Sequence, residues 1–202
     1  LLIMDGALPT WGAIKQRAFE KRYVRYIGKI HDKTCFAMDI EQGEHSLSYG
    51  NGVGIRQLYA LLPAEQMQAA LLGYQVVLWN RKNKFCGQCG SRTEERSAHV
   101  LVKTCPDCQA EFYPRISPSV IVAVKRDHEL LLAQHKRITN GMYTVLAGFV
   151  NPGETLEECV CREIKEEAGI EVRNLKYFGS QPWPFPDSLM IGFTADYAGG
   201  RV

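Results

Sequence analysis

The sequence has no long apolar run, no strong excess of one charge and no internal repeat. No apolar run approaches the roughly 20 residues that a membrane-spanning helix needs, so we expect no membrane protein. The net charge of +2 is too small to create a field that attracts nucleic acids or membranes by itself. No charged segment precedes an apolar one at the N-terminus, so we expect no secretory signal and a cytoplasmic location.

The composition is that of an ordinary globular protein, with 46% hydrophobic and 23% charged residues over a length of 202. Residues from about 22 to 50 read as short strands, with "HDK" as a hairpin turn between two of them, and helical spacing follows Pro63 to about Arg81. From Ser119 onward, one helix is flanked by stretches that read as strands: "SVIVAVK", "ELLLAQ" and "MYTVLAGFV" before it, and "NLKYFGSQ" and "LMIGFTADY" after it. This order predicts an α+β protein with an N-terminal α+β, β-rich domain over 1–82, a cysteine module over 83–113 and a layered domain over 114–202.

Four of the seven cysteines form two C-x2-C pairs with fifteen residues between them: Cys86, Cys89, Cys105 and Cys108. This spacing is typical of a four-cysteine zinc site, because each C-x2-C turn directs two thiolates to one point. Two disulfides are the alternative, which the length and the expected reducing compartment disfavour. A redox C-x-x-C would explain only one pair. We therefore interpret this cysteine module as a zinc ribbon whose first role is to stabilise the fold and whose second possible role is to contact RNA.

The best delimited helix lies between an "NPG" turn and Gly169. Thr155 and Glu158 fit the capping box of a helix N-terminus, and Gly169 fits a left-handed stop. Apolar residues recur four apart at Leu156, Val160 and Ile164, which predicts the buried face.

Three glutamates of this helix share another face: Glu163, Glu166 and Glu167. Like charges three and four residues apart destabilise a helix, so their clustering favours a bound cation. The adjacent Arg162 can pair with Glu158, Glu166 or Glu154, but cannot neutralise the whole set. Mg²⁺ is held by carboxylates together with substrate phosphates, which indicates phosphate chemistry. A solvated acidic face is the alternative.

The full stretch fits the pattern G-x5-E-x7-R-E-U-x-E-E-x-G-U from Gly148 to Ile170, and it resembles the Nudix box at every fixed position. The resemblance implies a Nudix α/β/α sandwich that hydrolyses a nucleoside diphosphate linked to another group. It assigns Mg²⁺ or Mn²⁺ to Glu163, Glu167 and the carbonyl of Ala147. By the same resemblance Glu166 is a further ligand or a base, Arg162 orients the glutamates, and Glu154 is a supporting acid.

A second motif, "SQPWPFPDS", follows the box at residues 180–188. Its three prolines exclude a helix and a central strand, so we expect a loop whose backbone is extended and stiff. Trp183 and Phe185 could then stack on a base, or could simply pack into the core.

This motif, together with the zinc module, resembles the NADH pyrophosphatase (NAD-capped RNA hydrolase) subfamily of Nudix hydrolases over about residues 83–197. The resemblance implies cleavage of NAD(H) to NMN(H) and AMP, removal of NAD caps from RNA 5′ ends, and a homodimer. The residues that it implies for substrate binding are Arg56, Tyr113, Phe149, Gln181, Pro182, Trp183, Pro184, Phe185, Pro186, Asp187 and Ser188.

Members of the subfamily continue beyond the position of Val202, where a tail supplies another metal-binding Glu and part of the pocket. The Nudix domain is therefore expected to be incomplete at its C-terminus, with a metal site but reduced or no turnover. Two alternatives stay open: hydrolysis of another nucleotide such as ADP-ribose, and a catalytically silent zinc-ribbon/Nudix module that binds NAD-capped RNA.

Overall fold

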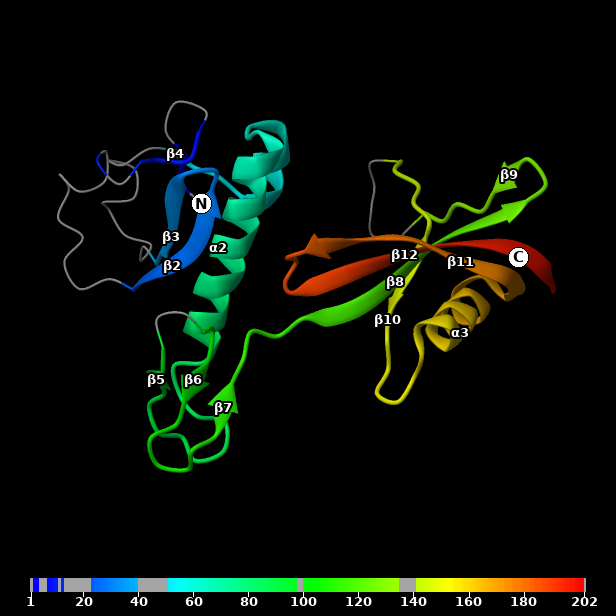
Figure 1. Cartoon of the computed structure of the whole chain (residues 1–202). Helices are drawn as coiled ribbons and strands as arrows, with labels where there is room; N and C mark the ends of the chain where they lie inside the picture. Colours follow the sequence, from blue (N-terminus) through cyan, green and yellow to red (C-terminus); the bar gives the residue numbers. More distant parts are fainter. Residues whose placement is uncertain are drawn as a thin grey trace. The chain divides into compact units, whose positions relative to one another are not determined.

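A computed structural model describes residues 2–3, 7–10, 12, 23–39, 51–97, 100–134 and 141–201. The chain divides into two compact units, Leu1–Arg115 and Ile116–Val202 (Figure 1). The three-part division expected from the sequence, with borders at 82/83 and 113/114, stays a prediction.

The first unit combines short strands with one long helix. Its elements are β1 (Leu2–Ile3), β2 (Val24–Ile30), β3 (Lys33–Met38), β4 (Asn51–Gly52), the 3-10 helix η2 (Ile55–Ala60) and α2 (Ala64–Lys82). Strands β2 and β3 form the predicted hairpin, and α2 begins directly after Pro63 as predicted. A Cβ on Gly73 of α2 would lie 3.6 Å from the Ala37 Cβ and the Ile27 Cδ1, so this helix packs closely on the hairpin.

The cysteine module ends the first unit with a three-stranded sheet. Its strands are β5 (Glu94–Glu95), β6 (Lys103–Thr104) and β7 (Glu111–Phe112). The module is tied to α2, because the buried Lys103 donates hydrogen bonds to the carbonyls of Asn80 and Asn83 at the C-terminal end of that helix. A cation suits this position, where the last carbonyls of a helix lack intrahelical partners.

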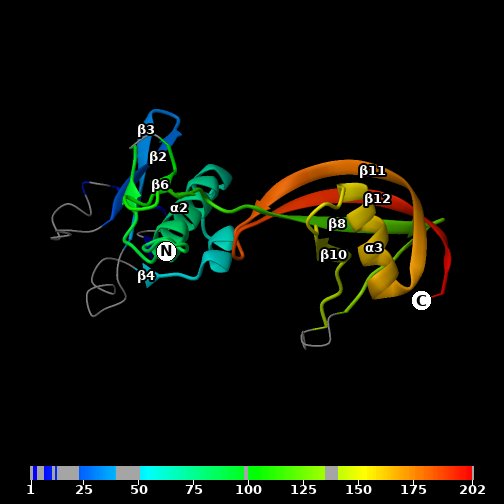
Figure 2. The same cartoon turned by 90° about the horizontal axis from the view of Figure 1, so that it is seen from below.

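The second unit is one mixed sheet with a helix on it. Its elements are β8 (Ser117–Arg126), β9 (Glu129–Leu130), β10 (Leu146–Phe149), α3 (Leu156–Ala168), β11 (Ile170–Trp183) and β12 (Ser188–Gly200). The strand order is β10-β8-β12-β11, with β9 paired to β8. Strands β8 and β12 run parallel and the other pairs are antiparallel. Figure 2 shows α3 lying along one face of this sheet.

The core of the second unit lies between α3 and the sheet. Val160 and Ile164 of α3 are fully buried, as predicted, and pack in one cluster with Val120 and Val122 of β8. This arrangement confirms the α+β class. Within residues 116–134 and 141–201, α3 is the one helix that covers the sheet, so the second helical layer of an α/β/α sandwich is not seen there.

Two strand predictions need correction. The stretch "ELLLAQ" was expected to be one strand, but its pairing is irregular: Glu129–Leu130 form β9 with β8, the Leu131 N–H donates to the Val124 carbonyl, and Ala133 forms an isolated bridge with Thr144. Leu130 and Leu132 are each 48% exposed, whereas Leu131 and Ala133 pack against the core, so only one side of this run is buried. The proline-rich motif was expected to be a loop, yet Gln181–Trp183 continue β11 and Ser188 opens β12. Pro182 is tolerated because β11 is the edge of the sheet.

In the part of the chain that the structure describes, no helix is both long and apolar enough to cross a membrane.

Candidate functional site

The glutamate helix α3 is fixed at both ends by its own sequence. The Thr155 hydroxyl accepts a hydrogen bond from the Glu158 N–H, and the Glu158 carboxylate accepts one from the Thr155 N–H. Gly169 ends the helix with a φ of 71°. These contacts confirm the predicted capping box and stop, and they set the register in which the glutamates emerge.

The Glu163 carboxylate lies on the backbone of Gly148 in β10. A Cβ placed on Gly148 would be 1.8 Å from the Glu163 Cδ, which no real pair of atoms tolerates. Glycine at this position therefore lets a carboxylate of α3 reach the exposed end of the neighbouring strand, next to Ala147. The predicted ligands Glu163 and Ala147 are thereby brought to one place.

Arg162 braces this arrangement with a branched set of hydrogen bonds. Its Nε and Nη2 donate to the two carboxylate oxygens of Glu154 at 2.6 and 2.8 Å, and its Nη1 donates to Glu163 at 2.8 Å. Nη2 also donates to the Phe149 carbonyl at 2.9 Å. Glu166 receives a longer contact of 3.3 Å. The guanidinium thus links helix, strand and loop, as a rigid fork of donors can.

The expected partners of Arg162 are confirmed for Glu154 and Glu166 but not for Glu158. The Glu158 carboxylate is occupied by Thr155 in the capping box, which is its nearest donor. The pKa of Glu154 is lowered to about 2, first by the hydrogen bonds from Arg162 and second by the hydrogen bond from the Asn151 N–H. Hydrogen bonds to Glu154 first and to Glu163 second raise the pKa of Arg162. Glu154 therefore stays a carboxylate at any ordinary pH.

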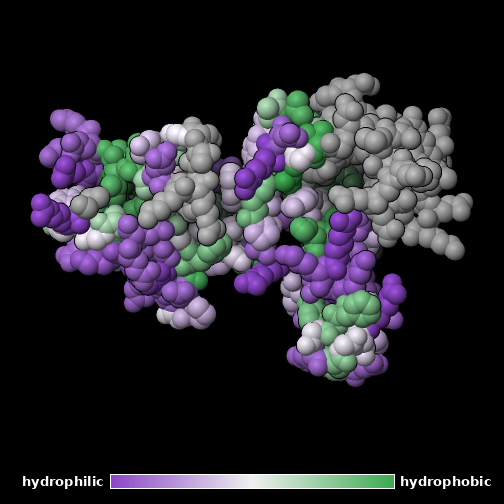
Figure 3. All heavy atoms as spheres, turned by 180° about the vertical axis from the view of Figure 1, so that it is seen from behind, coloured by the Kyte–Doolittle hydropathy of each residue, from purple (hydrophilic) through white to green (hydrophobic). Residues whose placement is uncertain are grey.

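The three glutamates differ in exposure. The Glu163 side chain is 14% exposed and that of Glu166 is 62% exposed. Glu167 is also exposed. Hydrophilic side chains gather over the region of α3 in Figure 3, where the second unit is seen from behind. Negative oxygens at one sheet edge, one of them fixed by Arg162, form a donor set that suits a hard divalent ion.

Register places the proline–aromatic motif at the same end of the sheet. Gly148 pairs with Val120 of β8, which pairs with Ile191 of β12. Ser117, three residues before Val120, pairs with Ser188 next to the tip of the β11–β12 hairpin. Three residues of strand span about 10 Å. A dinucleotide could therefore contact both the tip and the glutamates.

The hairpin tip, residues 183–188, presents two aromatic rings. The rings of Trp183 and Phe185 meet edge to face, with centroids 4.9 Å apart. Trp183 is 38% exposed, whereas Pro184 between them is fully buried. Both sequence interpretations therefore hold in part: the tip is packed through Pro184 and still exposes an aromatic surface. Gln181, Pro182 and Pro186 are exposed as well.

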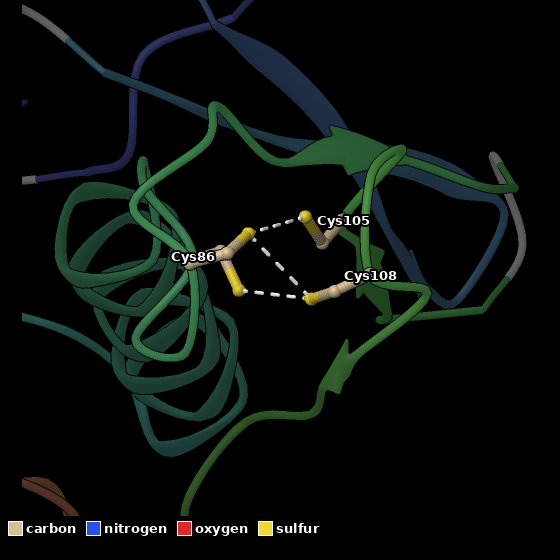
Figure 4. A group of neighbouring side chains, drawn as sticks. Cys86, Cys105 and Cys108 are labelled. Carbon is tan, nitrogen blue, oxygen red and sulfur yellow. Dashed lines mark hydrogen bonds between the residues drawn. The ribbon is translucent and has the colours of Figure 1, made fainter.

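The four paired cysteines converge in the first unit, as predicted. The side chains of Cys86, Cys105 and Cys108 point toward one another from two loops in Figure 4. Sulfur separations are 3.5 Å for Cys86 to Cys108, 3.4 Å for Cys89 to Cys105 and 3.6 Å for Cys89 to Cys108. All seven cysteines are free, so the disulfide alternative is wrong for this structure.

The cysteine geometry fits a tetrahedral metal. Zinc–sulfur bonds of about 2.3 Å place tetrahedral sulfurs about 3.8 Å apart, and all four sulfurs here lie within 4.8 Å of one another. Hydrogen bonds from Ser91 lower the pKa of Cys89 to about 6, which favours the thiolate that metals bind. Within the described residues this is the one group of three or more Cys, His, Asp or Glu ligands so closely spaced, and the α3 glutamates are spread more widely.

Comparison with known proteins agrees with this geometry. Residues 115–201 match the family model described as the NUDIX domain. The "NAD-capped RNA hydrolase NudC" of Pectobacterium atrosepticum is 52% identical over 202 residues, covering 98% of this chain and 73% of that protein. The protein of the same name from Pseudomonas aeruginosa is 52% identical over 137 residues, covering 67% of this chain and 49% of that protein.

This chain belongs to the Nudix family, in the group of the NudC proteins.

The chain spans about half the length of the Pseudomonas relative. Among solved structures, a NUDIX hydrolase from Nitrosomonas europaea is similar with a TM-score of 0.49 and 25% identity, over 57% of this chain and 68% of that one.

The other three residues predicted to bind substrate lie in both units. Phe149 ends β10 and is 56% exposed, while Arg56 lies in η2 and Tyr113 follows β7 in the first unit. The Tyr113 hydroxyl donates to the Glu111 carboxylate at 2.7 Å. The roles of these three residues in substrate binding stay predictions.

The sequence did not reveal two serines that form hydrogen bonds with residues of the candidate site. The buried Ser119 donates from its hydroxyl to the Gly148 carbonyl at 2.9 Å, which fixes the strand under Glu163. Ser117 contacts the hairpin tip through Asp187. Both lie in the segment "SPS" at the start of β8, and nothing in that segment distinguishes them from ordinary loop serines.

Proposed function

We propose that this chain hydrolyses the pyrophosphate of NAD(H) to NMN(H) and AMP and removes NAD caps from RNA 5′ ends. The observation that carries the proposal is the placement of two features at one end of the sheet. The first is Glu163, which is hydrogen-bonded to Arg162 and lies against Gly148. The second is the hairpin tip with the rings of Trp183 and Phe185. Their separation by about three residues of strand suits a dinucleotide.

Glu163, Glu167 and the carbonyl of Ala147 would hold Mg²⁺ or Mn²⁺, with Glu166 as a further ligand or the base. These are hard oxygen donors, which such ions prefer. A divalent ion bound there neutralises phosphate oxygens and lowers the pKa of a bound water.

The residues of the chain supply position and charge. Arg162 keeps Glu163 directed at β10 and holds Glu154 ionised. Trp183 and Phe185 offer ring faces to a base, and the stiff prolines around them limit the entropy lost on binding. Orientation and charge stabilisation account for most of the rate enhancement in phosphoryl transfer.

The cysteine cluster would hold Zn²⁺ as a structural ion, since all four positions are protein thiols and no open ligand position is left for chemistry. By resemblance to the subfamily, we also propose a homodimer and a cytoplasmic location.

The test is product analysis with NADH, NAD-capped RNA and ADP-ribose in the presence of Mg²⁺ or Mn²⁺. We expect AMP from NADH and release of the cap from RNA. The Pectobacterium relative serves as the positive control of the assay.

Matched variants assign the chemistry to the predicted site. Glu163→Gln and Glu167→Gln are nearly isosteric and should lower turnover by orders of magnitude. Glu157→Gln makes the same change on the same helix, at an exposed position to which no role is assigned, and should leave turnover unchanged. Cleavage of ADP-ribose alone would point to another nucleotide substrate. Binding of capped RNA without cleavage would point to the silent module.

A further inference from the structure

Hydrogen bonds between Ser117 and Asp187 connect the tip of the β11–β12 hairpin to the start of β8. The Ser117 N–H donates to the Asp187 carbonyl at 2.8 Å. The Ser117 hydroxyl donates to the Asp187 carboxylate at 3.1 Å. The backbone bond opens the parallel ladder between β8 and β12, which begins with Ser188 opposite Ser117. The side-chain bond is additional to that ladder.

The segment that this pair fastens is short and carries both aromatic rings. Four turn residues, 184–187, connect Trp183 to Ser188, which face each other across the hairpin. On the Trp183 side, the Phe185 N–H donates to the Trp183 carbonyl at 2.8 Å and Pro184 is buried. On the other side, Asp187 is the last turn residue, and its side chain reaches out of the hairpin to β8.

This arrangement fixes the direction in which the rings point. A partly exposed indole on a free hairpin end would sample several orientations, and ordering it would cost free energy when a ligand binds. Here Trp183 is 38% exposed but is held against Phe185 by a turn attached on both sides. The exposed ring is thus ordered before any ligand arrives.

We propose that Ser117, acting through Asp187, is a positioning residue for the aromatic tip and so determines affinity for the base of the substrate. This inference rests on the proposed function for its substrate. The glutamates lie apart from this tip. Glu163 contacts Gly148, which pairs with Val120 of β8, and Val120 is three residues along β8 from Ser117. Loosening the tip therefore weakens binding and leaves the chemical step in place.

The first experiment measures steady-state kinetics with NADH for Ser117→Ala and Asp187→Ala. Ordering a side chain on binding costs about 0.5–1.5 kcal/mol, so we expect KM to rise by about two- to twelvefold, with kcat within about twofold of the wild type. Ser117→Thr keeps the hydroxyl donor and Asp187→Asn keeps an oxygen acceptor, so each of these variants should have the KM of the wild type. Thr194→Val removes a hydroxyl from β12 six residues beyond Ser188 and should leave both constants unchanged.

The second experiment is independent of turnover. The chain is labelled with 5-fluorotryptophan, and the Trp183 fluorine resonance is assigned with Trp183→Phe. We expect Ser117→Ala and Asp187→Ala to shift or broaden that resonance in the protein without nucleotide, and Asp187→Asn to leave it in place. This readout supports or overturns the inference even for a chain that does not cleave NADH.

The inference is overturned by an unchanged Trp183 resonance and an unchanged KM in both alanine variants. It is equally overturned if kcat and the thermal midpoint fall while KM stays constant, because the pair would then only stabilise the fold. Should Ser117→Ala not fold, the comparison of Asp187→Ala with Asp187→Asn decides in its place.

Discussion

The carboxylate of Glu163 in α3 lies so close to Gly148 in β10 that any side chain at residue 148 would occupy its position. The glycine is therefore part of the glutamate site, although it carries no functional group. Its role is to leave the exposed end of β10 open to a carboxylate from the helix.

The first prediction concerns Gly148→Ala. The added methyl group meets the far end of the flexible Glu163 side chain, so the carboxylate should move while the fold persists. We expect the free energy of unfolding to change by less than about 1 kcal/mol. Affinity for Mn²⁺ should fall by about 10- to 100-fold, as when a metal ligand loses its support. Isothermal titration with Mn²⁺ and urea denaturation measure the two quantities.

Gly179→Ala is the matched control, because a Cβ on Gly179 of β11 meets nothing within 4 Å. It should leave Mn²⁺ affinity unchanged. Equal affinity losses in both variants would contradict the role given to Gly148. In the Glu163→Gln background, Gly148→Ala should have almost no further effect on the affinity, since the displaced group is already altered.

The second prediction concerns Arg162→Lys. Lysine keeps the positive charge but cannot donate at once to Glu154, Glu163 and the Phe149 carbonyl, because it lacks the planar fork. Glu163 then loses its fixed direction, and we expect both Mn²⁺ affinity and turnover to fall by about 10- to 100-fold. Lys165→Arg, an exposed change three residues along α3, provides the comparison. A fully active Arg162→Lys enzyme would show that charge alone is sufficient.

The third prediction is a pH dependence of stability that belongs to Glu154. Arg162 and the Asn151 N–H lower its pKa from 4.5 to about 2 in the folded chain. A lowered carboxyl pKa stabilises the folded state above the unfolded pKa, and this contribution is lost as the pH falls through the folded pKa. The gap in unfolding free energy between wild type and Glu154→Gln should therefore be constant above about pH 5 and shrink between about pH 4.5 and 2.

Denaturant unfolding at a series of pH values measures this gap. In the Arg162→Gln background the gap should nearly vanish, because the main donor to Glu154 is gone. A gap that stays constant down to pH 2.5 would mean that Glu154 is not held ionised by Arg162.

The fourth prediction concerns metal in the cysteine module. We expect about one tightly bound zinc ion per chain, measured by elemental analysis, and its loss in Cys108→Ser. Cys161→Ser, at an exposed cysteine outside the cluster, should retain the ion. Since the module is fastened to α2 through Lys103, chelation should also speed amide exchange in the last turn of α2. Unchanged exchange there after complete metal removal would show that the helix end does not depend on the module.

Much of the site could be predicted because its parts are local in the sequence. The capping box of Thr155 and Glu158, the stop at Gly169 and the buried stripe of Val160 and Ile164 each depend on residues a few positions apart. The C-x2-C turns are local in the same way. Each closes with a backbone hydrogen bond from the residue four positions after its first cysteine, Gly90 to Cys86 and Gln109 to Cys105.

What failed depended on contacts across the fold. Arg162 had three candidate partners within reach, and the choice of Glu154 over Glu158 follows from the capping box having already engaged Glu158. The run "ELLLAQ" looked like one strand because its residues are apolar, but only its first two residues belong to the regular ladder with β8, and Ala133 pairs instead with Thr144.

The sequence by itself determined where α3 begins and ends, which of its faces is acidic and how each C-x2-C turn closes, because hydrogen bonds and side-chain spacings within a single turn of chain decide these features. Only the tertiary structure decided that Glu163 rests on Gly148 and that Ser117 holds Asp187 at the aromatic tip. Each of these pairs joins residues of different elements. The two residues of a pair come into contact only when β10, β8 and β12 have paired and α3 has packed on the sheet.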